Sequence, residues 1–253
     1  MSWNPELYHK FQEERFAPYY DLIDLISVKE GIEGLDLGCG TGELTKMLSE
    51  KLPASRILGI DSSPAMLEQA KDKSAPGLSF ELRSIMDIEG EWDLIFSNAA
   101  IQWVQEHREL IPKLLSHIRP GGQLAIQIPS NHNHPTQDFI LETGREEPFS
   151  TALKGWTRSY SVLTIREYSE LLYDSEGEDI VVFEKIYPHV LPDSYAVLDW
   201  LSGTAILPYL ERLPVELHEP FLGVIGEKLK ESYPGSPVFY PYNRIFFSAH
   251  KPE

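Results

Sequence analysis

Short apolar runs alternate with helix-like repeats along the first half of the chain. Runs at 32–37, 55–60, 78–83, 92–98 and 123–129 have the length and composition of buried strands. Between them, apolar residues recur every three or four positions over 43–52 and 110–118, and Ser63-Pro64 is a typical helix start. Strands that alternate with helices through short connections predict a parallel sheet covered by helices on both faces.

The pattern loosens after residue 129. We expect loops and short helices over 131–177, a strand over 179–190 and a final strand over 243–250. The stretch 194–232 has a helical pattern that Pro208, Pro214 and Pro220 divide into pieces. The predicted fold class is α/β: a Rossmann-like seven-stranded sheet, mostly parallel with the last strand antiparallel, with helices on both faces and a helical cap.

Several element ends are marked by proline, glycine or a capping residue. Asn4 and Pro5 favour a first helix, and Pro18 favours a second short helix that ends near Ile26. Pro112 conflicts with a straight helix over 110–118, so we expect a kink or a late start there. The segment RPGG at 119–122 is expected to end that helix.

Composition narrows the classes of function. Asp and Glu number 39 against 22 Lys and Arg, which gives a net charge of −17. A field of that sign repels nucleic-acid backbones and anionic membranes, so we expect neither as a partner. The only cysteine is Cys39, which excludes an intrachain disulfide and disfavours zinc. No signal peptide or membrane span is evident, so a cytoplasmic location is expected.

Three glycines crowd into the turn after the first predicted strand, in the sequence LDLGCGTGE at 35–43. The spacing G-x-G-x-G differs from the dinucleotide fingerprint G-x-G-x-x-G, and Glu43 places a carboxylate where a pyrophosphate would meet the helix. Asp61 ends the second strand, where an acid can accept hydrogen bonds from ribose hydroxyls. The pattern favours a nucleoside that carries a cationic amino-acid group and no phosphate, such as S-adenosylmethionine.

Four segments resemble the successive motifs of class I S-adenosylmethionine-dependent methyltransferases. They are LDLGCGTG (35–42), GIDSSPAMLEQA (59–70), IMDIEGEWDLIFSNAAIQW (85–103) and IRPGGQLAIQIP (118–129). The N-terminal WNPELYHKFQEER and the string FSNAAIQWV are similar to trans-aconitate 2-methyltransferases, a family that methylates a carboxylate of a tricarboxylic acid. The similarity returns at YPHVLPDSYAVLDWLSGT (187–204) and YNRIFFSA (242–249).

The resemblance implies S-adenosyl-L-methionine as cofactor, with S-adenosyl-L-homocysteine as product. It also implies which residues hold the cofactor: Asp36, Gly38, Gly40 and Gly42 at its methionine part, Asp61 and Ser62 at the ribose, Met66, Asp87 and Ile88 at the adenine, and Asn98 nearest the transferred methyl group. Plainer explanations stay open: the glycines as an ordinary tight turn, Asp61 and Asp87 as solvated acids, Met66 as a core residue and Asn98 as a strand cap.

The same resemblance implies a site for a small carboxylic acid. The candidates are Tyr8, Asn98 and Trp103 at the reacting centre, and Arg15, Gln102, Tyr187, His189 and Arg244 around the acid. Tyr8 and Arg15 share one face of the N-terminal helix, which we expect to act as a lid that orders on ligand binding. The alternatives are a packed amphipathic helix, a core position for Trp103 and a surface position for Arg244.

We therefore predict one methyltransferase domain built from several kinds of segment. They are an N-terminal helical lid (1–28), a cofactor-binding core (29–130), two helical substrate-side insertions (131–178 and 191–240) and closing strands (179–190 and 242–250). We expect the protein to act as a monomer or a homodimer.

Methyl transfer from a sulfonium is an in-line displacement. A carboxylate, with a pKa of about 4, is already a nucleophile near neutral pH, so we expect no general base and no metal. Leu207 stands where the family usually carries an arginine, which leaves a smaller or more apolar acid open. Other possibilities are a different oxygen, nitrogen or carbon acceptor with His189 as the first candidate base, a nicotinamide oxidoreductase, and a cofactor-binding protein without turnover.

Overall fold

The computed structural model describes the backbone of residues 12–27 and 29–253, and the side chains of residues 16–27 and 29–253. Its strands are β1 (Glu33–Leu37), β2 (Arg56–Asp61), β3 (Leu78–Leu82), β4 (Trp92–Asn98), β5 (Ile118–Pro129), β6 (Glu178–Leu191) and β7 (Val238–His250). The α-helices are α2 (Gln12–Ile23), α3 (Glu43–Lys51), α4 (Pro64–Lys71), α5 (His107–Ser116), α6 (Pro135–Arg145), α7 (Phe149–Ala152), α8 (Ile165–Asp174), α9 (Ser194–Ser202), α10 (Leu207–Leu210) and α11 (His218–Ser232). Short 3₁₀ turns are η1 (Ile85–Asp87), η2 (Ile101–Trp103), η3 (Asn131–Asn133) and η4 (Val215–Leu217).

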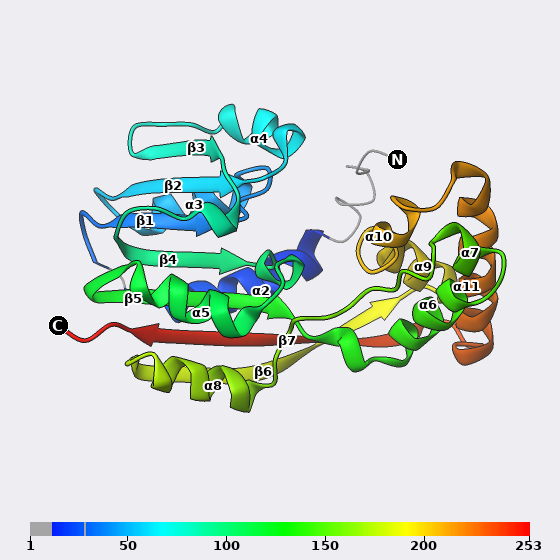
Figure 1. Cartoon of the computed structure of the whole chain (residues 1–253). Coiled ribbons are helices and arrows are strands. Elements are labelled where there is room, and N and C mark those ends of the chain that lie inside the picture. Colours follow the sequence, from blue (N-terminus) through cyan, green and yellow to red (C-terminus); the bar gives the residue numbers. More distant parts are fainter. Residues whose placement is uncertain (1–11, 28) are drawn as a thin grey trace. The chain divides into compact units, whose positions relative to one another are not determined.

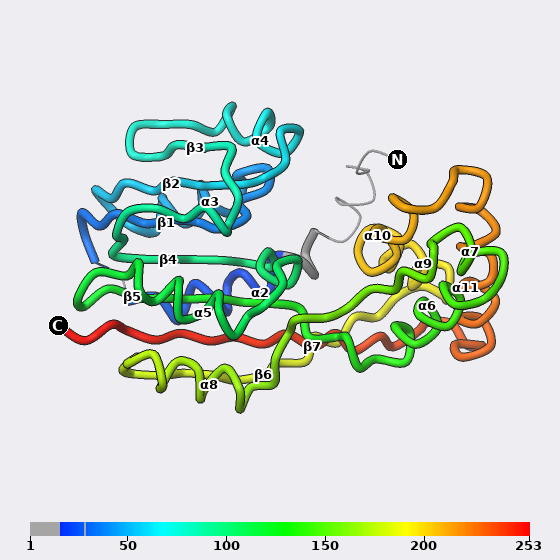
Figure 2. Tube along the Cα trace, viewed as in Figure 1, coloured from blue at the N-terminus to red at the C-terminus, as the bar shows by residue number. Residues whose placement is uncertain are grey.

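The strands form one seven-stranded sheet in the order β3-β2-β1-β4-β5-β7-β6 (Figure 1). The pairs among β3, β2, β1, β4 and β5 are parallel, and β7 runs antiparallel to β5. Figure 2 follows β7, drawn in red, between β5 and β6. The Rossmann-like class predicted from the sequence is confirmed. The strand order reverses between β1 and β4, which is where open α/β sheets bind ligands.

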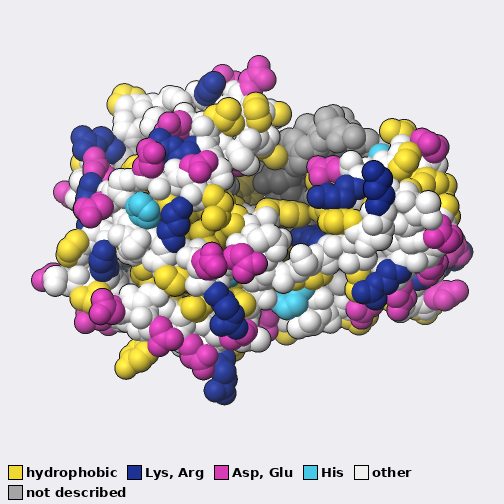
Figure 3. All heavy atoms as spheres, viewed as in Figure 1, with side chains coloured by type: hydrophobic (Ala, Val, Ile, Leu, Met, Phe, Trp, Pro, Cys, Tyr) yellow, Lys and Arg dark blue, Asp and Glu magenta, His cyan; other side chains and the backbone are white. Residues whose placement is uncertain are grey.

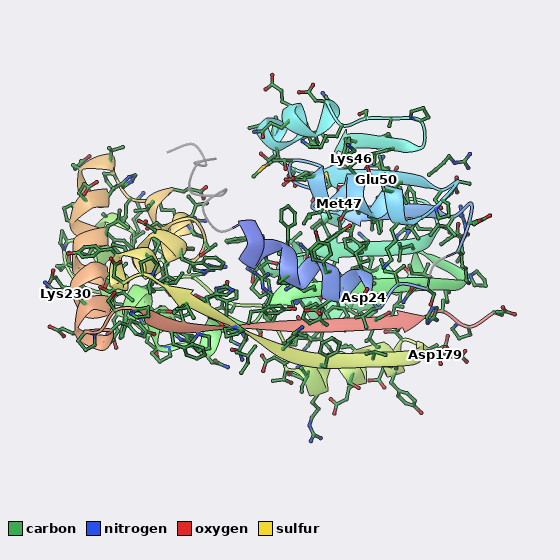
Figure 4. All side chains as sticks on the ribbon, turned by 180° about the vertical axis from the view of Figure 1, so that it is seen from behind. Asp24, Lys46, Met47, Glu50, Asp179 and Lys230 are labelled. Atoms are coloured by element: carbon green, nitrogen blue, oxygen red, sulfur yellow. The ribbon has the colours of Figure 1, made fainter. Side chains whose placement is uncertain are left out.

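The two faces of the sheet carry different helices. Leu35, Ile95 and Ile126 face the apolar side chains of α5 and α8, where Tyr168 stacks on Phe247 with ring centroids 4.6 Å apart. The opposite face carries α2 and α3, which Figure 4 shows from behind, with Asp24 just after α2 and Lys46, Met47 and Glu50 on α3. In this way, side chains alternate along each strand between an α5–α8 face and an α2 face.

The chain divides into two compact units. We call Phe16–Pro129, Ser161–Lys185 and Arg244–Glu253 the sheet unit, and we call the described stretches Ser130–Tyr160 and Ile186–Asn243 the helical unit. The helical unit has its own core, in which Phe149 and Tyr209 both pack on Phe221. This division differs from the expected one, because residues 161–178 belong with the sheet: Tyr168 and Leu172 of α8 lie in its core.

Several predicted element ends were wrong, and most of them involve proline. Pro18 lies inside α2, because Tyr19, Leu22 and Ile23 bury the following turn. Pro112 lies inside α5, so the predicted late start is wrong. Pro220 is the third residue of α11, where its missing N–H costs little, so it does not interrupt that helix.

Two strands are longer than predicted. The segment RPGG belongs to β5, which begins at Ile118 and has an irregular register against β4 between Trp92 and Leu94. Gly121 there has a φ of +69°, and its N–H bonds the carbonyl of Lys251. The last strand begins at Val238 rather than 243 and contains a proline, which sequence patterns treat as a break.

The surface carries mixed charges with an acidic excess. On the face drawn in Figure 3, Asp and Glu side chains are interspersed with Lys and Arg. Across the described residues, no helix combines the length and apolar composition that crossing a bilayer requires.

Candidate active site

The glycine turn joins β1 to α3 at the carboxyl end of the sheet. The N–H groups of Gly38 and Cys39 both donate to the carbonyl of Ile60, which ties the turn to the end of β2. Gly38, Gly40 and Gly42 have φ values of +72°, +56° and +75°. These left-handed conformations are costly for any residue with a Cβ, so the turn itself explains the three glycines.

The three glycines differ in what surrounds them. A Cβ on Gly38 would lie 2.2 Å from the Cβ of Ala100, and a Cβ on Gly42 would lie 2.7 Å from the ring of Phe80. A Cβ on Gly40 would have no atom of the described residues within 4 Å. Gly38 and Gly42 are therefore required by packing within the protein. Gly40 faces open space, which is what a ligand-facing glycine requires.

Asp36 lies at the base of this turn and is 3% exposed. The hydroxyl of Thr45 donates to its Oδ2 at 2.6 Å. Burial raises the pKa of Asp36 to about 7, with the charge of Asp61 adding to that rise and the Thr45 hydrogen bond opposing it. A cationic group placed beside this carboxyl would favour its ionised form.

Asp61 ends β2 and holds two neighbouring backbone segments. Its Oδ2 accepts from the N–H of Gly40 at 2.9 Å, and its Oδ1 accepts from the N–H of Ser63 at 2.8 Å. A carboxylate oxygen has a second lone pair, so both oxygens retain acceptor capacity for ligand hydroxyls. Asp61 is therefore more than a solvated acid, because it holds the backbone of Gly40 and Ser63. Ser62 beside it is exposed.

The predicted adenine-side residues come from two neighbouring segments. Met66 is half-buried in the first turn of α4, which Ser63 caps. Asp87 is exposed at the end of η1, and Ile88 after it is buried in the core of the sheet unit.

The end of β4 carries polar atoms that lack partners. Asn98 Oδ1 is buried without a hydrogen-bond partner among the described residues. Gln102 donates from Nε2 to the carbonyl of Ala99 at 2.7 Å, while its Oε1 is also buried and unpartnered there. Trp103 is 49% exposed, so the core alternative for it is wrong.

The register of the sheet brings a further group to this edge. Asn98 pairs with Gln127 of β5, and β7 pairs with β5 so that Arg244 lies opposite Pro129. By strand alternation Asn98, Gln127 and Arg244 lie on the α2 face. Arg244 donates from Nη1 to Gln127 Oε1 at 3.3 Å and is only 5% exposed. The surface-arginine alternative is therefore wrong.

Gln127 was not predicted from the sequence. The available signal was a polar residue inside the apolar run LAIQIP, but a sequence pattern does not reveal whether such a side chain has partners.

Tyr187 and His189 lie in the helical unit and are both buried. The His189 ring stacks on Tyr242 at 5.6 Å and meets Trp200 edge-on at 4.7 Å. These contacts place His189 in an aromatic cluster of its own unit. The assignment of Tyr187 and His189 to the acid stays a prediction.

Tyr8 and the side chain of Arg15 lie outside the described residues. The direction of α2 is described: the carbonyl of Leu25 accepts from Gln123, and the ring of Tyr19 packs on Phe96 at 5.9 Å. Phe96 pairs with Ala125, which is nearer the carboxyl end of β5 than Gln123. The amino-terminal end of α2 therefore points toward the edge that holds Asn98 and Gln127.

Other features of the described chain do not compete with this site. No cluster of three His, Cys, Asp or Glu side chains that would suit a metal occurs among the described residues. A hollow of about 230 Å³, lined in part by Glu33, Arg56 and Trp92, lies at the opposite, amino end of the strands.

Comparison with known proteins gives relatives in sequence and neighbours in structure. Residues 35–122 match the family model described as a methyltransferase domain. The chain is 42% identical to a trans-aconitate 2-methyltransferase of Deinococcus radiodurans over the full length of both chains. It is 32% identical to a Mycobacterium tuberculosis protein of the same name, over 98% of this chain and 96% of that one.

Solved structures share the fold at low identity. The YcgJ protein of Bacillus subtilis superimposes with a TM-score of 0.61 at 12% identity, over 94% of this chain and 99% of that chain. Phosphoethanolamine N-methyltransferase 2 of Haemonchus contortus, solved with S-adenosyl-L-methionine, gives 0.57 at 18% identity, over 94% of this chain and 52% of that chain.

Proposed function

The chain belongs to the trans-aconitate 2-methyltransferase family, and we propose that it transfers a methyl group from S-adenosyl-L-methionine to a carboxylate oxygen of a small organic acid, trans-aconitate first among the candidates. The observation that supports an acidic substrate is the burial of Arg244. Its guanidinium lies at the carboxyl edge of the sheet, in a chain of net charge −17. A guanidinium matches a carboxylate in shape and charge, so Arg244 at this edge suits an acidic ligand.

The residues at the glycine turn fit the cofactor. Gly40 borders open space, Asp61 retains acceptor capacity for ribose hydroxyls, and Asp36 favours a cationic neighbour. Glu43 at the start of α3 disfavours a dinucleotide pyrophosphate. We assign Gly38, Gly40, Gly42, Asp36 and Asn98 to the methionine part, and Asp61, Ser62, Met66, Asp87 and Ile88 to the nucleoside. When bound, the cofactor supplies an electrophilic methyl group on a positively charged sulfur.

The protein's own contribution is positioning. The acid is ionised near neutral pH, so its oxygen attacks without a base, and alignment with exclusion of water supplies the acceleration. A guanidinium that paired with the attacking carboxylate would lower its nucleophilicity. Arg244 therefore suits a second, non-reacting carboxylate, which supports an acid with at least two carboxyl groups.

The remaining candidates complete the acid's surroundings in this proposal. Gln102 and the exposed Trp103 follow β4 beside Asn98, and Tyr8 and Arg15 belong to the segment whose helix points toward that edge. Tyr187 and His189 are proposed to contribute hydrogen bonds. We further propose a cytoplasmic location and a monomer or homodimer.

The experiment that tests the function is an acceptor panel. Purified protein is incubated with methyl-labelled cofactor and a set of mono-, di- and tricarboxylic acids, phenols and amines, and S-adenosylhomocysteine release is followed. We expect turnover with polycarboxylic acids, trans-aconitate above all. Turnover confined to phenols or amines would move the function to another acceptor class, and a base such as His189 would then be required.

A further inference from the structure

Strand β5 carries two buried glutamines on the same face of the sheet, and they differ in their hydrogen bonds. Gln123 is 5% exposed and fully engaged: Nε2 donates to the Leu25 carbonyl at 2.7 Å and to the Ser248 hydroxyl at 2.8 Å, and Oε1 accepts from the N–H of Ser27. Gln127 is 0% exposed, and its Nε2 has no partner among the described residues.

The orientation of the Gln127 amide is fixed by chemistry. Arg244 carries only donors, so the atom that meets its Nη1 at 3.3 Å must be the amide oxygen. The NH₂ group then points away from the guanidinium. A buried donor without an acceptor costs about 1–3 kcal/mol, and native proteins retain few of them.

The position of the Gln127 Nε2 donor suggests that its partner is the acid substrate. Gln127 pairs in register with Asn98, whose Oδ1 is also buried and unpartnered. Asn98 ends β4, which pairs with β1, the strand before the glycine turn. Arg244 lies on β7, on the other side of β5 from Asn98. Gln127 thus stands between the residue assigned to the cofactor and the cation assigned to the acid.

We propose that Gln127 is a specificity residue for the acid: its Nε2 donates to an oxygen of the same non-reacting carboxylate that Arg244 pairs with, while its Oε1 holds Arg244 in place. This inference rests on the proposed function. A neutral amide donor beside a guanidinium presents two donor groups to one carboxylate, which distinguishes a carboxylate from a hydroxyl or an apolar group at that position.

The test is Gln127→Glu, with Gln123→Glu as matched control. The introduced carboxylate retains an oxygen for Arg244, loses the amide donor and adds a negative charge beside the acid. We expect trans-aconitate affinity, measured by calorimetry on the full chain loaded with S-adenosylhomocysteine, to fall at least about tenfold. Cofactor affinity should stay within about twofold, and KM should change far more than kcat.

The control changes the same residue type on the same strand and face. Gln123→Glu removes donors to Leu25 and Ser248, so the melting temperature should fall while trans-aconitate affinity per folded molecule is kept. Gln127→Met serves as a second variant, because it removes the amide donor and the amide oxygen without adding charge. It should also weaken acid binding.

Carboxamide analogues separate a direct contact from a structural role. If Nε2 contacts a carboxylate, one monoamide of trans-aconitate should bind the Gln127→Glu variant more tightly than trans-aconitate does, since its N–H groups can donate to the new carboxylate. Unchanged acid affinity in both Gln127 variants would overturn the inference, because Gln127→Met removes both the Nε2 donor and the Oε1 that accepts from Arg244. If the wild-type protein binds no acid, the proposed function itself fails.

Discussion

Replacement of Gly40 should weaken cofactor binding with little effect on folding. Its Cβ would lie within 4 Å of no atom in the part of the chain that the structure describes, so Gly40→Ala should fold with only the strain of a left-handed alanine, roughly 1–2 kcal/mol. We expect cofactor affinity to fall by about tenfold or more, because the new methyl group occupies the space we assign to the ligand. Calorimetric titration with S-adenosylhomocysteine measures this.

Gly31→Ala is the matched control for that strain. Gly31 has a φ of +71°, is exposed, and has no atom of a described residue within 4 Å of the position that a Cβ would take. It lies before β1, away from the glycine turn, so it should lose similar stability and keep cofactor affinity. Equal losses of affinity in both variants would show that strain, not ligand contact, matters at Gly40.

Asp36 gives the site a pH dependence with a definite sign. Its pKa rises from 3.8 to about 7 in the folded protein through burial. Between these values the folded chain holds a proton that the unfolded chain has released, so this group's contribution makes the free energy of unfolding fall as pH rises from about 4 to about 7. Above a pH of about 7 this contribution to the free energy of unfolding falls no further.

Asp36→Asn should remove this contribution while retaining an acceptor for Thr45. Without cofactor, the variant should melt above wild type near pH 8, by roughly 2–4 °C per kcal/mol recovered, and the difference should disappear near pH 4. It should also bind the cofactor more weakly, since the carboxylate is lost. A lower melting temperature than wild type near pH 8 would contradict the assignment.

The sequence alone predicted the site residues that lie at or next to the ends of strands. Asp36, the glycines and Asp61 stand next to apolar runs, and parallel strands bring their carboxyl ends to one edge. Gln127 was not predicted because the missing partner of a buried amide is a property of three-dimensional neighbours. Arg244 was named from resemblance alone, and its burial and its bond to Gln127 required the structure.

The loop after β4 is braced by a contact between α5 and α8. His107 Nε2 donates to the Ile101 carbonyl at 2.8 Å, so its Nδ1 must accept from the hydroxyl of Tyr168, at 2.5 Å. The N–H of Leu163 in turn donates to that hydroxyl. Burial lowers the pKa of His107, which keeps the ring neutral as this arrangement requires.

Tyr168→Phe should therefore leave the buried Nδ1 of His107 and the half-buried N–H of Leu163 without their partner. We expect a loss of about 1–3 kcal/mol in the free energy of unfolding, measured with urea. Tyr173→Phe, on the same helix and 74% exposed, should change nothing. If the two variants prove equally stable, the buried hydroxyl is not holding α8 to α5.

The N-terminal segment offers a test of the lid prediction. α2 is anchored through Tyr19, whose hydroxyl donates to the Leu44 carbonyl at 2.9 Å, and through the buried Leu22 and Ile23. Deleting residues 1–11 should therefore leave a folded protein. We expect turnover to fall about tenfold or more, because the predicted lid, with Tyr8 in it, is lost. Full activity in the truncated protein would remove the lid.

Strands such as β1 and β4 were predictable because they are continuous, buried apolar runs, and element ends were less predictable at prolines. Pro18 and Pro112 lie inside helices whose neighbouring apolar residues are buried, so packing outweighs the local preference. Pro220 is tolerated for another reason, because it stands in the first turn of α11. The added length of β7 has the same cause, since Val238, Tyr240 and Tyr242 alternate into the core of the helical unit.

The whole chain is one family member with two compact cores. No linker marks the division in the sequence, because β6 and β7 contribute residues to both units without interruption. That is why a single domain was expected. The sheet unit alone contains the glycine turn, Asn98, Gln127 and Arg244, so the residues that carry the methyltransferase proposal share one compact unit.

The central claim is that this protein esterifies a carboxylate of a small polycarboxylic acid. Its most direct test is the product formed from trans-aconitate and cofactor carrying a deuterated methyl group, identified by mass and by lability to alkali. The account predicts a monomethyl ester that carries the label and releases it as methanol on hydrolysis. A label that is recovered in an alkali-stable product, or on no acid at all, would contradict it.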